Sequence, residues 1–599
     1  MAFERNTRII CTMGPAIRSV DSIRALIQKG MNMARFNFSH GDHEYHGEGI
    51  RLVREAARLE GVPVALILDT KGPEIRTGNV KDGGTITLQN GQAIEVISEA
   101  DARSLFGDDG VFATAERLTL SYAGLARDIK VGAKILIADG LFSLEVTGVD
   151  GPHIFCTVTN GGILGSRKNV NVIGVRTRLP ALSDQDKADI KFGVEQWMDF
   201  IAASFVRKAA DVTTIHKYLA DLGSDIPVIA KIEDEEGLEN IEDIIRVSAG
   251  IMVARGDLGV QIPTERVPLE QKRIIRLCNQ AGKPVITATQ MLESMIKNPR
   301  PTRAEAGDVA NAILDGTDCV MLSGETANGQ YPEAAVSVMD QIARTVEASD
   351  EYKRALDERR NYLSASEDIA DAIADAAALT ADRIGAVALV VPTLRGNTAR
   401  LISRHRPRRK IVAATPSDTV QRRLLLHWGV VPIKVEQESD SESMIQQAIS
   451  AAMREGFAKK ADKVVVVAGI PLNSPLMTNS IRVHVIGNIL GRGLTGFGGR
   501  CSGRIVKAKT LEEAAMALRK NGGEILLTHT LDESFIPILR VVDGVILEGV
   551  SEMPWEMVKT INPNIVYVSQ VPQALNRFEE HITVTLDGNE KLIYEGALL

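Results

Sequence analysis

The chain has 599 residues, of which 44% are hydrophobic, and a formal net charge of -8 at pH 7. That length exceeds what one hydrophobic core serves, so we expect several domains. The net negative charge argues against nucleic acid or another polyanion as a partner. The sequence has no run of about 18 uncharged apolar residues, and its start, MAFERNTRII, lacks the apolar stretch of a signal peptide. We therefore expect a cytoplasmic protein that has no membrane partner.

Short apolar runs alternate with stretches of helical pattern through the first half of the chain. Eight parallel strands with intervening helices specify a (β/α)8 barrel, or TIM barrel. The expected strands are 8–12, 31–35, 64–69, 200–204, 227–232, 250–254, 284–289 and 318–322.

The spacing of these strands is interrupted once. About 130 residues separate the third run from the fourth, far more than a crossover connection needs. The interval contains alternating strand patterns broken by Gly and Asn, such as TITLQNGQAIEVI and KILIADGLFSLEVTGV. We therefore expect an inserted β lid domain at 77–172, with the barrel divided into 1–76 and 173–345.

Two charged clusters end neighbouring predicted strands. Lys231 and Glu233 follow one run, and Arg255, Gly256 and Asp257 follow the next. Two carboxylates suit a hard divalent cation, and a lysine suits a phosphoryl group, so the pair predicts a site for Mg²⁺ beside a phosphorylated substrate. The alternative is a surface ion pair near two strand ends.

Other polar residues also fall at the carboxyl ends of the predicted strands. In barrels of this type that rim carries the active site, so the clustering favours a functional site, although any single member could be structural. Together with the two charged clusters, the rim residues are Arg35, Asn37, Ser39, Asp69, Thr70, Ser204, Arg207, Lys231, Glu233, Arg255, Asp257, Thr289, Ser323 and Glu325.

Long ordered blocks in this region resemble the pyruvate kinase family. They include MNMARFNFSHG (31–41), DTKGPEIRTG (69–78), IAKIEDEEGLENI (229–241) and VARGDLGV (253–260). ITATQMLESM, MLSGETANG and GSRKNVN extend the resemblance, which covers roughly residues 5–486. The resemblance implies a glycolytic enzyme that transfers the phosphoryl group of phosphoenolpyruvate to ADP, giving pyruvate and ATP.

The resemblance also implies roles at the substrate. Lys231 would contact the transferring phosphoryl group and Arg35 would hold the phosphate, both acting by charge neutralisation. Glu233 and Asp257 would ligate Mg²⁺ or Mn²⁺. The backbone around Gly256 would contact the substrate carboxylate, and a side chain there would obstruct that approach. Thr289 would lie near the carbon that is protonated, with water as the proton source.

Nucleotide and monovalent-cation sites follow by the same resemblance. Asn37, His40, Arg76 and Lys168 match nucleotide contacts, although His40 could instead be a rim histidine that only packs. Asn37, Ser39, Asp69 and Thr70 match an all-oxygen K⁺ site. Glu74 predicts K⁺ activation, because family members that do not need K⁺ carry Lys there. Asn169 stands where the family usually has Gly, a change that could alter lid closure.

Beyond the barrel we expect an α/β regulatory domain at 346–487. A charged helical stretch at 335–362 and a capping box at 364–367 precede strands at 386–391, 410–415, 430–435, 463–468 and 481–486. A strand-loop-helix junction suited to a phosphate contains Thr393, Arg395, Asn397 and Thr398. It favours a phosphorylated effector, a sugar phosphate or AMP, although Arg395 could fill the pocket itself and the loop GIPLNSPLM departs from the usual version. The basic run 400–410 is more typical of a solvated interface face than of a ligand site.

Residues 488–599 extend beyond the core fold and resemble the swivelling phosphohistidine domain of phosphoenolpyruvate-using enzymes, which some bacterial pyruvate kinases carry. The stretch from Glu548 to Trp555, where active domains have a histidine, contains none. His529 and His581 lie elsewhere and are expected to be ordinary strand-end residues. The domain is therefore expected to be structural or regulatory.

Three functions are consistent with the sequence: an active pyruvate kinase, which is favoured, a metal-dependent aldolase on the same barrel, and a non-catalytic effector-binding or scaffolding protein. The aldolase would have no use for the nucleotide and K⁺ positions. Family resemblance also suggests a homotetramer.

Overall fold

The computed structural model describes residues 4–362, 368–471, 478–487, 489–518 and 524–597. Its contacts divide the chain into two compact units. The first comprises Met1–Asp382, Leu389–Ala451 and Val467–Ile481, and the second comprises Arg383–Ala388, Ala452–Val466 and Arg482–Leu599.

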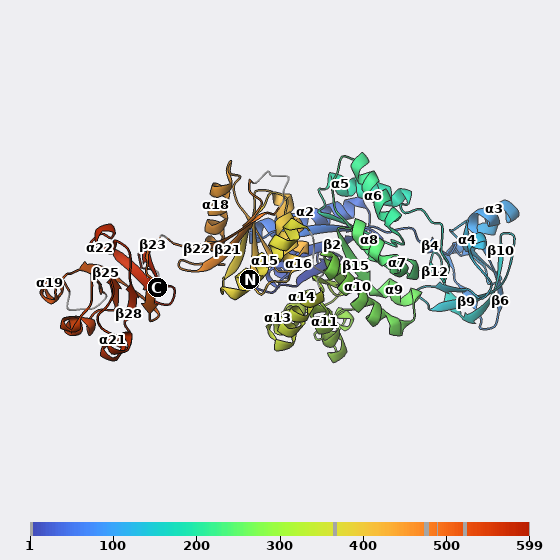
Figure 1. Ribbon diagram of the computed structural model, residues 1–599. Helices are drawn as coiled ribbons and strands as arrows, with labels where there is room; N and C mark the ends of the chain where they lie inside the picture. Colours follow the sequence, from blue (N-terminus) through green and yellow to red (C-terminus); the bar gives the residue numbers. More distant parts are fainter. Residues whose placement is uncertain (1–3, 363–367, 472–477, 488, 519–523, 598–599) are drawn as a thin grey trace. The chain divides into compact units, whose positions relative to one another are not determined.

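A closed parallel barrel forms the centre of the first unit (Figure 1). Its strands follow the order β1-β17-β16-β15-β14-β13-β3-β2, and every expected barrel strand is present. They are mostly apolar because helices cover the outside while side chains such as Ile10, Met33, Ile229 and Met252 fill the inside. The strands are β1 (Arg8–Thr12), β2 (Met33–Asn37), β3 (Ala65–Asp69), β13 (Phe200–Ala203), β14 (Val228–Ile232), β15 (Gly250–Ala254), β16 (Val285–Ala288) and β17 (Cys319–Leu322).

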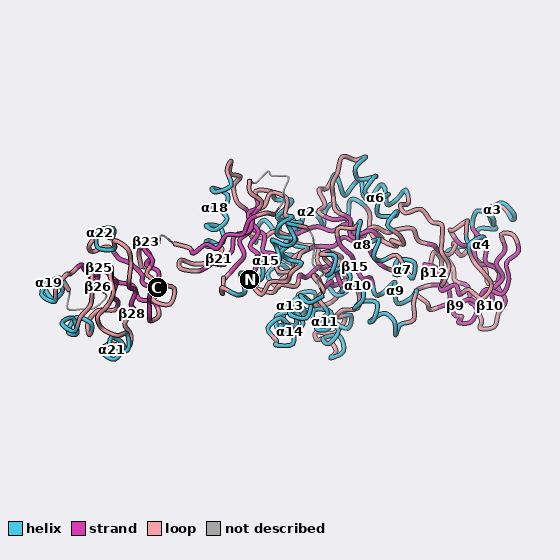
Figure 2. Tube along the Cα trace, in the orientation of Figure 1, coloured by secondary structure: helices cyan, strands magenta, loops and turns pink. Residues whose placement is uncertain are grey.

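Helices surround this barrel, and Figure 2 distinguishes them from the strands by colour. Side-chain caps fix where several begin: Asp42 accepts the Tyr45 N–H at the start of α2, and Ser183 forms a capping box with Asp186 at the start of α5. The barrel helices are α1 (Val20–Gln28), α2 (His43–Glu60), α5 (Asp184–Glu195), α6 (Ala209–Asp221), α7 (Glu235–Glu239), α8 (Ile241–Val247), α9 (Arg255–Gln261), α10 (Val267–Ala281), α11 (Arg303–Asp315), α12 (Gly324–Ala327) and α13 (Pro332–Ala348), with 3-10 turns η3 (Thr264–Arg266) and η4 (Glu293–Ile296).

The long interval after β3 contains a β domain, which we call the lid. Its main sheet has the order β4-β12-β8-β9-β10-β6-β7, and β11 pairs with β5. A separate apolar core that includes Val96, Leu118, Ile135 and Leu144 holds it together. The elements are β4 (Ile75–Arg76), η1 (Lys81–Gly83), β5 (Ile86–Leu88), β6 (Ala93–Ser98), α3 (Glu99–Phe106), η2 (Asp108–Val111), β7 (Arg117–Leu120), α4 (Leu125–Asp128), β8 (Lys134–Ile137), β9 (Phe142–Asp150), β10 (His153–Asn160), β11 (Gly162–Leu164) and β12 (Asn169–Ile173).

An α/β domain follows the barrel, with sheet order β20-β19-β18-β21-β22. The charged stretch expected as one helix is two, α13 and α14, because the chain turns extended at Ser349, whose side chain accepts the Tyr352 N–H. The expected capping box at 364–367 lies outside the described residues. The elements are α14 (Asp350–Tyr362), α15 (Ile369–Arg383), β18 (Ala388–Pro392), α16 (Asn397–Arg404), β19 (Lys410–Thr415), α17 (Asp418–Arg423), η5 (Leu424–Leu426), β20 (Val430–Lys434), α18 (Ser441–Arg454), β21 (Lys463–Ala468) and β22 (Ser480–Val485).

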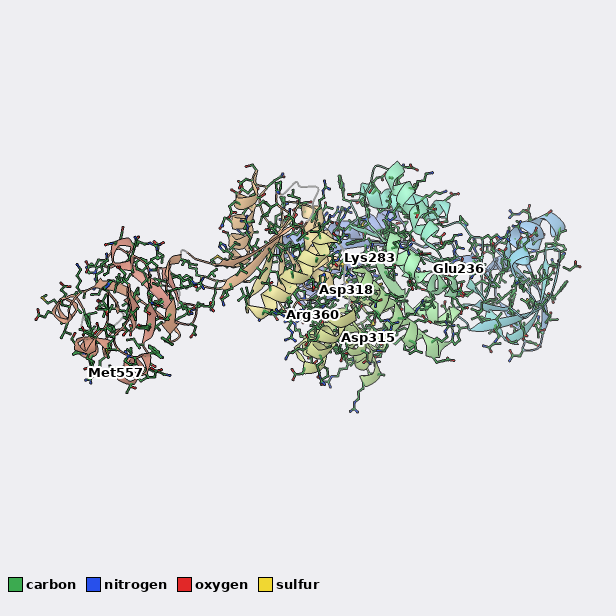
Figure 3. The ribbon with its side chains drawn as sticks, viewed as in Figure 1. Glu236, Lys283, Asp315, Asp318, Arg360 and Met557 are labelled. Carbon is green, nitrogen blue, oxygen red and sulfur yellow. The ribbon has the colours of Figure 1, made fainter. Side chains whose placement is uncertain are left out.

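The basic run 400–410 lies at an interface, but its inward-facing members are less solvated than its composition indicates. Arg406 is 4% exposed and pairs with Asp318 at 2.9 Å, while Arg404 pairs with Asp371 at 2.8 Å. Asp318, labelled in Figure 3, also accepts the Val285 N–H at the start of a barrel strand. The run therefore joins the α/β domain to the barrel, because buried carboxylates offset the charge of its inward-facing members.

The C-terminal part forms one mixed sheet with the order β23-β30-β29-β25-β26-β27-β28-β24. Parallel strands β25 to β28 are central, and apolar clusters around Leu526 and Ile525 cover opposite sides. The elements are β23 (Ile489–Arg492), β24 (Thr495–Phe497), β25 (Arg500–Lys507), α19 (Leu511–Ala517), β26 (Glu524–Thr528), η6 (Glu533–Phe535), α20 (Ile536–Leu539), β27 (Gly544–Leu547), α21 (Trp555–Ile561), β28 (Val566–Ser569), α22 (Ala574–Arg577), β29 (Thr583–Asp587) and β30 (Leu592–Glu595).

None of the helices in the described part of the chain combines the length and the apolar character that a membrane span requires.

Candidate active site

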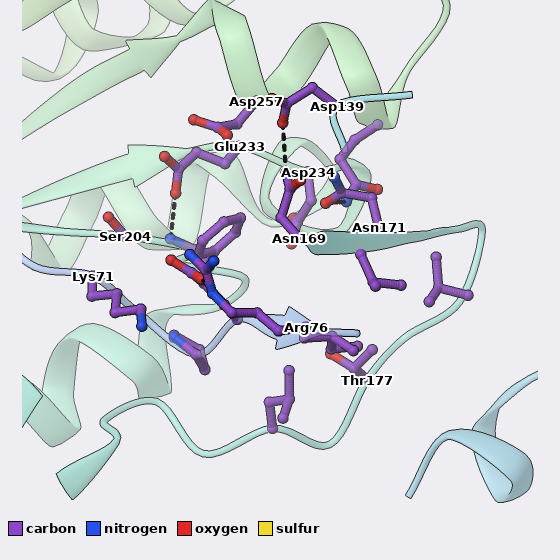
Figure 4. A pocket seen from close by; sticks show the side chains of 18 of the residues that line it. Lys71, Arg76, Asp139, Asn169, Asn171, Thr177, Ser204, Glu233, Asp234 and Asp257 are labelled. Atoms are coloured by element: carbon purple, nitrogen blue, oxygen red, sulfur yellow. Dashed lines mark hydrogen bonds and ion pairs between the residues drawn. The ribbon is translucent and has the colours of Figure 1, made fainter. Parts of the chain in front are cut away.

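A cavity of about 680 Å³ lies between the carboxyl ends of the barrel strands and the lid (Figure 4). It brings together residues that come from widely separated parts of the sequence. The predicted site residues that line it are Arg35, Asn37, Ser39, His40, Arg76, Lys168, Lys231, Glu233 and Asp257. Asp69, Thr70, Gly256 and Thr289 are not part of this lining but are bonded to residues of the site, as described below.

Lys231 is the centre of a buried hydrogen-bond network at the end of β14. Its Nζ donates to Asp69 Oδ1 at 3.0 Å and Ser204 Oγ at 2.7 Å, and lies 2.9 Å from Glu233 Oε1. Burial alone would lower the pKa of Lys231, but the carboxylates of Asp69 and Glu233 outweigh it and hold the pKa above its usual value. The amine therefore stays an ammonium ion.

The carboxylates of Glu233 and Asp257 both face this cavity (Figure 4). Burial, reinforced by the negative charge of Asp257, raises the pKa of Glu233 to about 7, although Lys231 opposes the shift. Glu233 Oε2 accepts the Phe205 N–H at 2.5 Å, which fixes the side chain. Two carboxylates that line the same cavity fit a hard divalent metal, whose shell would be completed by water and substrate oxygens.

No group of three or more His, Cys, Asp or Glu side chains suited to a metal occurs among the residues that the structure describes. A site with only two protein carboxylates is consistent with that finding, because Mg²⁺ usually keeps several waters and substrate oxygens.

Arg35 and Asp69 extend the network toward β2 and β3. Arg35 Nε donates to Asp69 Oδ2 at 2.6 Å, and Arg35 Nη1 donates to Thr12 Oγ1 at 3.0 Å. Burial would raise the pKa of Asp69, but Arg35 and Lys231 hold it below its usual value. Asp69 therefore accepts hydrogen bonds from both Arg35 and Lys231, the two cationic side chains that face the cavity.

The proposed monovalent-cation residues offer oxygens within the same region. Asn37 Oδ1 accepts the Ser39 N–H at 3.2 Å. Thr70 Oγ1 accepts the Ser204 N–H at 3.1 Å, and the Thr70 carbonyl accepts Ser204 Oγ at 2.7 Å. The donor set is made of amide, hydroxyl and carboxylate oxygens, as a K⁺ site requires.

Gly256 and Thr289 meet directly. The Gly256 N–H donates to Thr289 Oγ1 at 2.8 Å, while a Cβ placed on Gly256 would lie 3.6 Å from the Thr289 side chain. Thr289 has a φ of +64°, a costly conformation for a β-branched residue. Arg255 holds it there, because its Nη2 donates to the Thr289 carbonyl at 2.7 Å. The Arg255 guanidinium therefore supports the site through the backbone.

Lid residues face the cavity from the opposite side. Arg76 Nε donates to Glu74 Oε2 at 2.5 Å, and Arg76 Nη1 donates to the Arg167 carbonyl at 2.8 Å. Lys168 is exposed, with its backbone N–H bound to Thr77 Oγ1 at 2.9 Å. Asn169 Nδ2 donates to Asp139 Oδ1 at 2.5 Å, a contact within the lid that a glycine could not make (Figure 4).

His40 is exposed on the rim and lines the cavity. Its carbonyl oxygen accepts a hydrogen bond from His46 Nε2 at 2.7 Å, and its N–H donates to the Asn37 carbonyl at 3.2 Å. The backbone is thus fixed while the ring faces solvent.

The proposed effector residues lie apart from this cavity, at the start of α16. The Thr393 hydroxyl accepts the Gly396 N–H at 2.9 Å, and the Thr398 and Thr478 hydroxyls are 2.8 Å apart. Arg395 is exposed and Asn397 half-buried. Most of the loop GIPLNSPLM, residues 472–477, lies outside the described residues.

The structure adds residues that the sequence reasoning did not assign to the site. Thr12 ends the first barrel strand, so the strand-end rule that found the others could also have found it. Ser204 and Arg207 are expected from the sequence to support the residues that contact the substrate, without named partners; in the structure Ser204 binds Lys231, and Arg207 binds the connection to the lid. Side-chain direction decides these contacts, and a linear sequence does not specify it.

In the C-terminal sheet, His529 directly follows β26 and is exposed. Its Nδ1 lies 3.6 Å from Glu548 Oε1, beyond hydrogen-bond range. Glu548 Oε2 instead accepts a hydrogen bond from the Leu575 N–H at 2.9 Å.

Comparisons with known proteins show which family this chain belongs to. Residues 4–336 match the family model "Pyruvate kinase, barrel domain", and residues 371–484 match "Pyruvate kinase, alpha/beta domain". The pyruvate kinase of Geobacillus stearothermophilus is 46% identical over 597 residues, and that of Staphylococcus aureus strain MRSA252 is 41% identical over 595 residues, with 99% of both chains covered in each case. The crystal structure of a pyruvate kinase from Cryptosporidium parvum superposes with a TM-score of 0.75 at 41% identity, covering 80% of this chain and 96% of that one. The chain belongs to the pyruvate kinase family, whose members are phosphotransferases.

Proposed function

We propose that this protein transfers the phosphoryl group of phosphoenolpyruvate to ADP in glycolysis, forming pyruvate and ATP. The observation that carries the proposal is the meeting of the Lys231 ammonium with the Glu233 carboxylate, 2.9 Å apart, in a cavity that Asp257 also lines. Phosphoryl transfer depends on positioning and charge neutralisation, and this arrangement supplies both.

Positive charge is placed where the reaction develops negative charge. Lys231 would neutralise the equatorial oxygens of the transferring group and the departing enolate, while Arg35 would hold the phosphate. The Gly256 backbone would contact the substrate carboxylate. Thr289, bonded to the Gly256 amide, lies beside the place where the enolate carbon would take up a proton from water.

Glu233 and Asp257 would hold Mg²⁺ or Mn²⁺, which would supply positive charge to offset the negative charge of the phosphorylated substrate. Asn37, Ser39, Asp69 and Thr70 would hold K⁺. On the lid side, Arg76 and Lys168 would contact the nucleotide together with His40 and Asn37.

Regulation and assembly complete the proposal. A phosphorylated effector, a sugar phosphate or AMP, would bind near Thr393, Arg395, Asn397 and Thr398, or Arg395 would act as a built-in substitute for its phosphate. Residues 488–599 would be a swivelling-type domain without a phosphohistidine role, and the domain boundaries at 76, 172, 345 and 487 stay predictions. A cytoplasmic homotetramer is expected.

Measuring pyruvate released from phosphoenolpyruvate, with and without ADP, tests this function. Release that requires ADP and yields an equal amount of ATP is the expected result. Pyruvate formed from oxaloacetate but not from phosphoenolpyruvate would favour an aldolase, and no turnover of either would favour a binding protein.

A further inference from the structure

The loop 204–207, between β13 and α6, contacts both the metal-binding side of the site and the lid. At its start, Ser204 Oγ accepts from Lys231 Nζ at 2.7 Å, and the Phe205 N–H donates to Glu233 Oε2 at 2.5 Å. Phe205 has a φ of +54°, and a Cβ placed on Gly72 would approach its ring to 2.9 Å. The loop is therefore tightly constrained beside the catalytic residues.

The last residue of this loop binds the chain that returns from the lid to the barrel. Arg207 Nη1 donates to the Thr177 carbonyl at 2.9 Å and to Thr177 Oγ1 at 3.1 Å. Arg207 Nη2 donates to the Leu179 carbonyl at 2.7 Å. Thr177 and Leu179 belong to the segment between β12 and α5, which we call the return linker, and both line the cavity. Thr177 is labelled in Figure 4.

Arg207 is itself held firmly by the barrel. It is 6% exposed, its N–H donates to Asp211 Oδ2 at 3.0 Å, and its carbonyl accepts Asn240 Nδ2 at 2.9 Å. From the lid side, the Tyr122 hydroxyl accepts the Arg178 N–H at 2.9 Å, between the two residues that Arg207 holds. The return linker is thus bound to the lid by Tyr122 and to the barrel by Arg207.

We propose that Arg207 is a positioning residue that sets the distance between the lid and the metal-binding carboxylates during phosphoryl transfer. The inference rests on the proposed function, because it concerns where the lid presents ADP. Arg207 touches neither substrate nor metal in this account. It acts through the return linker on one side and through the loop that fixes Glu233 on the other.

Arg207→Ala removes three donated hydrogen bonds to the return linker, so the linker that carries the lid is no longer held to the barrel by this side chain. We expect the KM for ADP to rise and kcat to fall, each on the order of tenfold to a hundredfold, because small misplacements of reacting groups are costly. The KM for phosphoenolpyruvate should change less than about threefold, since no substrate contact is removed. Arg207→Lys should recover part of the loss, because an ammonium can reach one carbonyl but cannot span both.

The matched control is Arg178→Ala, on the same linker. Arg178 is 79% exposed and its side chain pairs with Asp128 at 3.3 Å, so its removal should leave both KM values near those of the unaltered protein. Exchange of the pyruvate methyl protons with solvent provides a second readout. On the proposed function this exchange would use the metal side of the site and would not involve transfer to a nucleotide, so it should stay within about threefold of normal in Arg207→Ala.

Hydrogen exchange of the return-linker amides is a readout independent of turnover. Faster exchange at 176–182 in Arg207→Ala, but not in Arg178→Ala, is expected whether or not the protein converts phosphoenolpyruvate. An inactive unaltered protein would reject the proposed function, whereas unchanged linker exchange would reject the role of Arg207. The inference would also be overturned if both KM values rose equally and proton exchange slowed to the same extent, or if the KM for ADP stayed unchanged. Should Arg207→Ala fail to fold, the same comparisons apply to Arg207→Lys.

Discussion

Lys231 has an environment that stabilises its charge. A buried ammonium ion is costly unless it is paired and hydrogen-bonded. Lys231 is only 7% exposed, but oxygens of Asp69, Ser204 and Glu233 lie within 3.0 Å of its Nζ. The charge is therefore fixed in the cavity before substrate arrives, which avoids reorganisation during the reaction.

Lys231→Met should lower kcat by about 10²–10³-fold, the scale expected when one fixed group that stabilises transition-state charge is lost. Binding of Mn²⁺, followed by electron paramagnetic resonance, should persist because Glu233 and Asp257 are retained. Lys217→Met, at an exposed position of α6, is the control and should leave kcat unchanged. A Lys231→Met protein with normal kcat would contradict the assigned role.

Lys410 predicts a pH effect on stability. Burial, with the nearby charge of Arg8, lowers the pKa of Lys410 to about 7, and Glu347 only partly offsets the shift. Its Nζ donates to the Glu4 carbonyl at 2.8 Å and Asn6 Oδ1 at 2.7 Å, two acceptors that a neutral amine can satisfy. Between pH 7 and the higher pKa of the unfolded chain, the unfolded state binds more protons, so stability should rise with pH.

The rise in the free energy of unfolding due to Lys410 is at most about 1.4 kcal/mol per pH unit. It is measured as the change in Tm between about pH 7.5 and 9, compared between the unaltered protein and Lys410→Met. The variant should gain less stability over this interval, while Lys434→Met, an exposed residue on β20, should behave as the unaltered protein does. Identical pH profiles for all three proteins would contradict the prediction.

At the residue scale, looking for polar residues at the carboxyl ends of the predicted strands located the rim residues, because the carboxyl ends of all parallel barrel strands lie at one rim. It could not assign partners. The link from Arg207 to Thr177 crosses from a barrel loop to the lid connection, and it depends on a long side chain with many rotamers. Roles such as the Lys231 contact with the phosphoryl group came from family resemblance and stay proposals.

At the scale of elements, the connection from β3 to β4 carries Glu74, on which the K⁺ prediction rests. Glu74 Oε2 accepts from Arg76 Nε at 2.5 Å, so the negative charge faces a predicted nucleotide contact. Without K⁺ this edge of the site lacks the positive charge that a lysine would supply.

In buffer free of both Na⁺ and K⁺, turnover should fall on the order of tenfold or more, because fixed charge beside a transferring phosphoryl group contributes on that scale. Glu74→Lys should restore turnover without K⁺. Glu74→Gln, which removes the pairing with Arg76 but adds no cation, should not restore it. Full activity of the unaltered protein in K⁺-free buffer would reject the prediction.

The sequence predicted buried strands better than helix ends. Continuous apolar runs identify parallel strands because both of their faces are covered. The break between α13 and α14 at Ser349 was missed, since a single serine gives a weak local signal inside a charged helical pattern. The inward arginines of 400–410 were also missed, because their carboxylate partners Asp318 and Asp371 are distant in sequence.

At the scale of the whole molecule, the C-terminal sheet begins at Ile489, far in sequence from the residues that line the cavity. Within the second compact unit it contacts β21 and its neighbours: Lys463 pairs with Glu590 at 2.6 Å, and Arg500 Nη2 donates to the Ala461 carbonyl at 3.0 Å. These contacts predict a role in stability or assembly.

A protein ending at residue 487 should therefore keep its turnover while its Tm falls by about 2–4 °C, the scale of a loss near 1 kcal/mol in a large domain. Initial rates and the oligomeric state of the truncated protein check this. Lys463→Met in the full chain removes the ion pair alone and should show a smaller change in Tm. Complete loss of turnover in a truncated protein that stays in solution as a tetramer would contradict the prediction.

The insertion and the tail interrupt a regular strand spacing, and this is why the sequence predicts several domains. The predicted boundaries stay predictions, and the five-stranded sheet contributes residues to both compact units.

The central claim is that Glu233 and Asp257 hold the metal through which this rim transfers a phosphoryl group to ADP. The most direct test measures ATP and pyruvate formation by the unaltered protein and by Glu233→Gln across a Mg²⁺ titration. We predict equal amounts of both products in the unaltered protein, strictly dependent on ADP and Mg²⁺. Glu233→Gln should need more Mg²⁺ and lose about 10²-fold or more in kcat, because one metal-binding charge is gone. Normal kcat and normal Mg²⁺ dependence in Glu233→Gln would contradict the account.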